Sequence, residues 1–109
     1  MNKYSLIMIV VKRGFAETVM EAAKSQGAKG GTIIHARGTS SKETEMFLGI
    51  NIEPEKDLVL VIIEDEKRKA VMRAINKKAG INLEGNALVF ALPVDEVIGS
   101  INADKYEDD

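Results

Sequence analysis

The stretch Gly27-Ala-Lys-Gly-Gly-Thr-Ile-Ile-His-Ala-Arg-Gly38 decides the fold, because it places four glycines around a short β-branched run. Glycine lacks a Cβ atom, so it lets the backbone turn tightly or pass close to another backbone. The first three glycines suit a connection from a helix into a strand, and the β-branched residues favour the strand itself. We therefore predict a turn, a strand over about Gly31–Ala36 and, at Gly38, the entry to a long loop.

The apolar pattern on either side of this stretch predicts further strands and two helices. The runs Leu6–Val11 and Leu58–Ile63 are apolar at every position, which is typical of strands covered on both faces. Residues Phe15–Gln26 have apolar residues at helical spacing, and Gly27 stands where a helix C-cap glycine is expected. A second helix is predicted after Asp65, its expected N-cap, to about Ala79-Gly80, and a last strand over Ala87–Leu92 that runs into Pro93-Val94.

No helix or strand is predicted from Thr39 to Asp57. Loops of this length are uncommon in compact domains and are usually functional or mobile. The segment carries more apolar residues than a solvated loop needs, namely Met46, Phe47, Leu48, Ile50 and Ile52. We expect it to pack on a ligand, a neighbouring subunit or a partner protein.

The order of these elements is βαββαβ, which predicts an α+β, ferredoxin-like sandwich. Two helices cover one face of a four-stranded antiparallel sheet, and the other face is bare. Because Leu6–Val11 and Leu58–Ile63 need cover on both faces, we predict that the bare face is buried by homo-oligomerisation. One domain is expected over residues 1–101, followed by an acidic, flexible tail over 102–109.

The composition excludes several classes of protein. The chain has 109 residues and a net charge of −2, so it has no basic excess with which to bind nucleic acid. It has no cysteine, which excludes disulfides and is compatible with the cytoplasm, where we expect it. The apolar run near the N-terminus is too short to span a membrane, so no membrane insertion is expected.

The residues with reactive or charged side chains predict a binding protein and not an enzyme. His35 is the only histidine, and no pattern nominates partners for a catalytic triad or a zinc site. Lys12-Arg13 and Arg37 each stand at a strand end beside a glycine, where a cation can reach an anionic ligand. The segment Leu83–Asn86 is compatible with a small anion-cradling turn, although it contains no lysine.

The order of elements, the glycine-rich stretch and the long loop after it resemble the PII family of signal-transduction proteins. Gly27, Gly30, Thr32 and Gly38 fall in register with the family's Gly-x-x-Gly-x-Thr strand entry, and Phe90 with Leu92-Pro93-Val94 fits its last strand. The resemblance implies a homotrimer that binds adenine nucleotides between subunits and acts on a partner protein through the 39–57 loop. It also implies a binding cleft lined by Thr32, Ile34, Arg37 and Gly38 on one side and by Gly85-Asn86 on the other.

Two departures from the family pattern set this chain apart. A typical member has a Thr-Gly-x-x-Gly-x-Gly-Lys turn before the last strand, whereas Asn82–Leu88 has one glycine and no lysine; the arginines expected after that strand are also absent. Each lost cation removes a charge-assisted contact of about 1.5–3 kcal/mol, so tight ATP binding of the usual kind is not expected. The 39–57 loop has no tyrosine that a modifying enzyme could use.

The sequence therefore predicts a divergent, PII-like regulator that is not an enzyme. Its effector is an adenine nucleotide or a less highly charged ligand, and its partner protein is unknown. Two alternatives stay open. One is a trimer similar to CutA, with a divalent metal ion such as copper at His35; the other is a structural trimer without a ligand.

Overall fold

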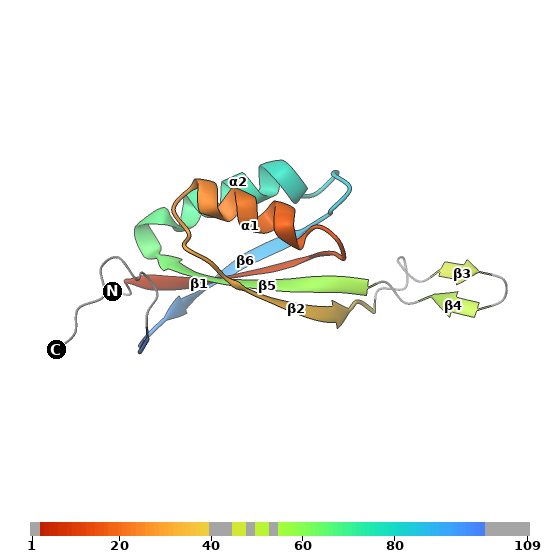
Figure 1. The fold of residues 1–109 in the computed structure, drawn as a ribbon, viewed down its shortest axis with the longest axis horizontal. Helices are drawn as coiled ribbons and strands as arrows, with labels where there is room; N and C mark the ends of the chain where they lie inside the picture. The colour runs from red at the N-terminus through yellow and green to blue at the C-terminus, as the bar shows by residue number, and fades with distance from the viewer. Residues whose placement is uncertain (1–2, 40–44, 48–49, 53–54, 100–109) are drawn as a thin grey trace.

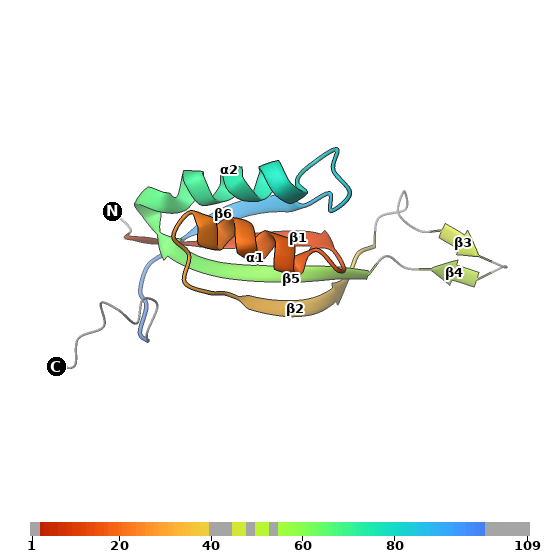
Figure 2. The same cartoon turned by 45° about the horizontal axis from the view of Figure 1, so that its top comes forward.

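The computed structural model describes residues 3–39, 45–47, 50–52 and 55–99. These residues form a four-stranded antiparallel sheet in the order β2-β5-β1-β6, with two helices on one face, as predicted (Figures 1 and 2). The elements are β1 (Tyr4–Lys12), α1 (Ala16–Ser25), β2 (Thr32–Arg37), β3 (Glu45–Phe47), β4 (Ile50–Ile52), β5 (Glu55–Glu64), the 3₁₀ helix η1 (Asp65–Lys67), α2 (Arg68–Ala79) and β6 (Leu88–Val94).

The core lies between the helices and one face of the sheet. Alternate residues of the two central strands are fully or almost fully buried there, because successive side chains of a strand point to opposite faces. On β1 these are Ile7, Ile9 and Val11, and on β5 they are Val59, Val61 and Ile63. Val19 of α1 and Val71, Ile75 and Ala79 of α2 cover them. Burial of this set is the main source of the domain's stability.

The opposite face of the sheet is apolar and open in the single chain. The other residues of β1, among them Leu6, Met8 and Val10, are only half-buried. The register places exposed apolar side chains of the other three strands on the same face: Ile34 of β2, Ile62 of β5, and Leu88, Phe90 and Leu92 of β6. The two central strands are therefore uniformly apolar in the sequence because each one has an inner core face and an outer apolar face.

The glycine-rich stretch turns and packs as expected at two positions. Gly27 follows α1 with a φ of +108°, a left-handed conformation that favours glycine, and its N–H bonds to the carbonyl of Lys24. At Gly31 a Cβ atom would lie 2.7 Å from the carbonyl oxygen of Leu60 and 3.0 Å from the sulfur of Met20. Gly31 is thus the point at which the chain passes close over β5 before β2 begins.

The structure corrects the prediction for residues 39–57. β5 begins at Glu55, three residues before the predicted start at Leu58, and β3 pairs with β4 in a separate two-stranded sheet. This hairpin projects beyond the end of the main sheet (Figure 1). Two strands of three residues are too short for their alternation to be recognised in a sequence. The remaining residues of the segment, and the predicted tail over 102–109, lie outside the described part of the chain.

Asp65 does not cap α2. It begins the 3₁₀ helix η1, and α2 starts three residues later at Arg68 without a capping side chain. The Asp65 carboxylate instead accepts a hydrogen bond of 2.6 Å from Ser5 of β1 and lies 3.2 Å from Nε of Arg68. The carboxylate therefore joins the start of β1 to the start of α2.

Candidate functional site

The residues predicted to line a cleft lie at one end of the sheet but at its two opposite edges. Thr32, Ile34 and Arg37 are exposed on the edge strand β2, with Gly38 directly after it. Gly85-Asn86 precede β6, the other edge strand, and the N–H of Lys12 donates to the carbonyl of Gly85. This is the end from which the β3–β4 hairpin extends (Figure 1).

The two sets of residues do not form one cleft within a single chain. Three strand spacings separate β2 from β6, which is about 14 Å. Thr32 and Ile34 share the open face of the sheet with Leu60 and Leu58, while Arg37 pairs with Glu55 and falls on the other face of the strand. A cleft that uses both sets needs β2 of one copy beside the α2–β6 turn of another.

The α2–β6 turn, residues 80–87, uses its own backbone donors. The N–H of Leu83 bonds to the carbonyl of Gly80, that of Asn86 to Leu83, and that of Ala87 to Ala79. A phosphate cradle needs several backbone N–H groups that point outward together. Three donors of this turn are already paired, so it is not a ready-made anion site.

Packing explains why Gly85 is a glycine. A Cβ atom there would lie 3.1 Å from the Cβ of Ala79 and 3.3 Å from the ring of Phe15. The turn's outer side chains are apolar or acidic: Ile81 is 69% exposed, Leu83 is 44% exposed, and Glu84 is exposed and is the turn's one charged residue. Whether Gly85 and Asn86 contact a ligand stays a prediction.

At the opposite edge, Arg13 ties together the strands from which the 39–54 segment leaves. Its Nη1 lies 3.0 Å from the carboxylate of Glu55, and its Nη2 donates to the carbonyls of Ala36 and Lys56, both at 3.4 Å. The guanidinium therefore bridges the turn after β1, the end of β2 and the start of β5. Arg13, one of the cations that the sequence suggested for an anionic ligand, is occupied by these contacts.

Asp57 is the buried centre of the same network. Its side chain is 4% exposed, and it lies 2.7 Å from Nδ1 of His35 and 3.6 Å from Nε of Arg13, while the N–H of Gly14 donates to it at 3.3 Å. Burial alone would raise the pKa of Asp57, but the hydrogen bonds from His35 and Gly14 and the charges of His35 and Arg13 together lower it. The carboxylate therefore stays ionised and fixes three elements at this end of the sheet.

Sequence reasoning missed Asp57, although a signal was present. With β5 extended back to Glu55, Asp57 falls in the same alternation as the buried residues Val59, Val61 and Ile63. A carboxylate at an inward-facing position needs partners, and Arg13 and His35 supply them. The side chain of His35 is 73% exposed, and its Nδ1 lies on the carboxylate of Asp57.

The described part of the chain holds neither a candidate metal cluster nor a helix suited to a membrane. No group of three or more His, Cys, Asp or Glu side chains there could hold a metal ion. No described helix has the length and apolar character required to cross a membrane.

Comparison with known proteins gives a family and a fold. Residues 4–102 match the family model described as "Nitrogen regulatory protein P-II". Among solved structures, the chain is similar to Arabidopsis thaliana PII bound to citrate, with a TM-score of 0.67 and 20% sequence identity over 91% of this chain and 82% of that one. No curated protein sequence matches it. At this identity the structural likeness concerns the fold.

Proposed function

Because this chain belongs to the nitrogen regulatory protein P-II family, we propose that it is a non-enzymatic, cytoplasmic regulator. It binds a small effector between the subunits of a homotrimer and acts on a partner protein through residues 39–57. The observation that carries this proposal is the placement of the two predicted walls at the same end of the sheet but on its opposite edges. That placement suits a cleft between neighbouring subunits.

The open face of the sheet supports assembly. Leu88 is 62% exposed, Leu92 45% and Ile34 44%, and all three lie on the face that no helix covers. Monomeric proteins rarely expose a continuous apolar surface across a whole sheet. In the proposed trimer each subunit packs this face inward, and the edges β2 and β6 of different subunits come together.

The β2 wall supports an anionic or polar effector. Arg37 stands at the exposed end of β2, and the fixed base beneath it, made by Arg13, His35 and Asp57, holds the strand end in one position. Such preorganisation lowers the cost of ordering a binding site. Our first candidate is an adenine nucleotide, held on this side by Thr32, Ile34, Arg37 and Gly38.

The α2–β6 turn supports a ligand of lower charge than ATP. It supplies no lysine, three of its N–H groups already donate to backbone carbonyls of the turn or of α2, and its outer side chains are Ile81, Leu83 and Glu84. Phosphate groups on this side would lie near Glu84, and the turn itself contains no cation that could compensate this charge. We therefore expect ADP, AMP or a smaller anion to bind at least as well as ATP.

The β3–β4 hairpin is the part of residues 39–57 that we propose to act on the partner protein. A two-stranded sheet is only marginally stable by itself, so contacts with an effector or a partner can change its population. The base from which it extends is rigid, since Arg13 joins β2 to β5 there. Effector binding at Gly38 would be transmitted directly into this segment.

A thermal-shift screen with limited proteolysis tests the proposal. ATP, ADP, AMP and citrate are added separately at increasing concentration, and a ligand present at 100 times its Kd should stabilise the fold by about 2.7 kcal/mol. The same ligand should change the cleavage rate within residues 39–54. A panel in which no compound alters either the melting temperature or the cleavage would contradict an effector-binding role and favour the structural trimer.

The metal-binding alternative rests on the orientation of His35. A carboxylate on Nδ1 leaves Nε2 available, which is the usual arrangement of a histidine that ligates a metal. Calorimetric titration with Cu²⁺ separates the two functions. Stoichiometric binding that is lost in His35→Ala would favour the metal-binding role, whereas unchanged heat in that variant would exclude His35 as the ligand.

A further inference from the structure

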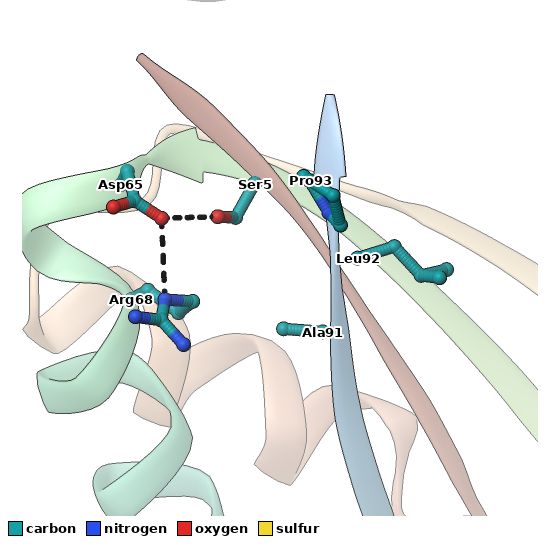
Figure 3. A pocket seen from close by; sticks show the side chains of 6 residues that line it. All are labelled: Ser5, Asp65, Arg68, Ala91, Leu92 and Pro93. Carbon is teal, nitrogen blue, oxygen red and sulfur yellow. Dashed lines mark hydrogen bonds and ion pairs between the residues drawn. The ribbon is translucent and has the colours of Figure 1, made fainter. Parts of the chain in front are cut away.

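The proposed cleft does not use a pocket at the far end of the sheet. This open pocket of 230 Å³ lies between the end of β6 and the start of α2, and it is lined by Ser5, Asp65, Arg68, Ala91, Leu92 and Pro93 (Figure 3). Residues 95–99 continue from β6 toward the face of the sheet opposite α2, so they do not close it (Figures 1 and 2). All six lining residues belong to one chain, so the pocket does not depend on the proposed trimer.

Arg68 brings a guanidinium with unused donors to this pocket. Its Nε is buried and lies 3.2 Å from Oδ1 of Asp65, an ion pair without a hydrogen bond. Ser5 donates to the same carboxylate oxygen at 2.6 Å (Figure 3). The two terminal nitrogens of Arg68 have no acceptor among the described residues. The edge of the guanidinium that they form can therefore bind an anion through two parallel hydrogen bonds.

The neighbouring edge of β6 offers a backbone donor. In an antiparallel pair, residues that bond to the partner strand alternate with residues whose N–H and C=O point away from it. The N–H of Lys12 bonds to Gly85 on the β6 side of β1, so the even-numbered residues of β1 bond to β6. Ala91 pairs with the odd-numbered Ile7, and β6 is an edge strand. The N–H of Ala91 therefore points to the open edge beside the pocket, and Pro93, which has no N–H, takes the next outward position.

The strand also gives the pocket an apolar wall. Ala91 and Pro93 pair with Ile7 and Ser5, which are buried on the helix side of the sheet, so the side chains of Ala91 and Pro93 lie on that side as well. Leu92 points away and lines the pocket with its backbone (Figure 3). A ligand thus meets a cation and an N–H group at one end and a methyl group and a proline ring beside them.

We propose that this pocket binds a carboxylate that carries a short apolar body. The carboxylate accepts hydrogen bonds from the terminal nitrogens of Arg68 and from the N–H of Ala91, and the apolar body lies on Ala91 and Pro93. A planar monoanion matches the guanidinium fork. A phosphate dianion fits less well, because the carboxylate of Asp65 lies on the same guanidinium and repels further negative charge.

Two sources supply this chemistry, and a titration followed by amide NMR distinguishes them. Butyrate represents a free short-chain acid, and N-acetyl-trialanine represents the C-terminus of an extended peptide, which can also pair with the β6 edge. Both should shift the amide signal of Ala91, whereas butyramide and the amidated peptide should not. Tighter binding of the peptide than of butyrate would assign the site to a peptide C-terminus, and the reverse order to a free acid.

Variants test the residues that hold the carboxylate. Arg68→Gln should weaken butyrate binding at least about tenfold, because two charge-assisted hydrogen bonds are lost. Arg68→Lys keeps the charge without the fork and should restore only part of the affinity. Ala91→Leu fills the pocket and should also abolish binding. Arg73→Gln is the matched control, since it removes one exposed arginine of the same helix, and it should bind as the wild-type protein does.

Three results would overturn the proposal. The first is an Ala91 signal that does not move with butyrate, or that moves equally with butyramide. The second is equal butyrate affinity in the wild-type protein, Arg68→Gln and Ala91→Leu. The third is inorganic phosphate that binds more tightly than butyrate at the same ionic strength. None of these results depends on whether a nucleotide binds in the proposed cleft.

Discussion

The two walls of the proposed cleft are built in opposite ways. At the β2 edge, Arg13 and Asp57 hold three elements together through contacts between residues far apart in the sequence. At the β6 edge, the α2–β6 turn is closed by backbone hydrogen bonds and packs on Ala79 and Phe15 without an ion pair that an arginine or aspartate of the turn could make, since it contains neither. The β2 wall therefore depends on long-range charge contacts, and the turn depends on shape.

This difference suggests which wall carries ligand recognition. The β2 wall keeps an exposed arginine above a rigid, charged base, whereas the turn offers paired N–H groups and apolar or acidic side chains. A chain that retains one wall and rebuilds the other is expected to keep the location of the site and change its ligand preference. Four measurements test this contrast, from the largest expected effect to the smallest.

Removing the buried carboxylate should have the largest effect on the β2 wall. Asp57→Ala leaves Arg13 without one partner, frees the N–H of Gly14 and deletes the contact of His35, so we expect a loss of about 3 kcal/mol in the free energy of unfolding. Urea denaturation measures it. Glu84→Ala on the other wall is the matched control and should change stability by less than about 0.5 kcal/mol.

Because Asp57 is ionised in the folded protein, we also expect the stability of the fold to depend on pH. The folded state lowers the pKa of Asp57, so its contribution is present above the ordinary aspartate pKa of about 3.9 and is lost as the pH falls below it. The wild-type protein should therefore lose its greater stability over Asp57→Asn as the pH falls from about 4 to the pKa of Asp57 in the folded state. Equal acid unfolding curves for the two proteins would show that the Asp57 carboxylate does not stabilise the β2 wall.

Alanine at three glycines compares the packing of the two walls. Gly31→Ala brings a Cβ to 2.7 Å from a backbone oxygen and should cost about 2 kcal/mol, while Gly85→Ala meets the Cβ of Ala79 at 3.1 Å and should cost about 1 kcal/mol. A Cβ atom at Gly30 would point into open space, with no neighbouring atom within 4 Å, so Gly30→Ala should be neutral or slightly stabilising. Melting temperatures in the reverse order would contradict the described close approaches.

Ligand affinity should change by less free energy than the stability losses expected for Asp57→Ala and Gly31→Ala. Arg37→Ala should weaken binding of the best nucleotide about tenfold, or about 1.4 kcal/mol, because one charge-assisted contact is lost. Glu84→Lys should instead raise the affinity for ATP more than that for AMP, since it restores a cation to the turn. Calorimetry with Lys24→Ala as a surface control checks both. Equal affinities in all four proteins would place the ligand away from both walls.

The sequence was sufficient to predict the sheet, the helices and the glycine-rich connection, because these follow from apolar runs and from the residues that favour turns. It was not sufficient for the Arg13–Asp57 network, since the polar residues Glu55-Lys56-Asp57 concealed the first three positions of β5. It also placed the start of α2 at Asp65, whose carboxylate is used by Ser5 on a strand 60 residues away. Long-range partners of this kind leave no local pattern.

The central claim is that the two walls meet only between copies of the chain, and the mass of the protein in solution tests it most directly. Native mass spectrometry is performed on wild type and on Leu88→Lys with Leu92→Lys, which places charges on the open face. We predict a trimer for wild type, about three times the 11.9 kDa of one chain, and dissociation in the variant. A wild-type protein that remains a monomer at micromolar concentration and still binds its effector would contradict the claim.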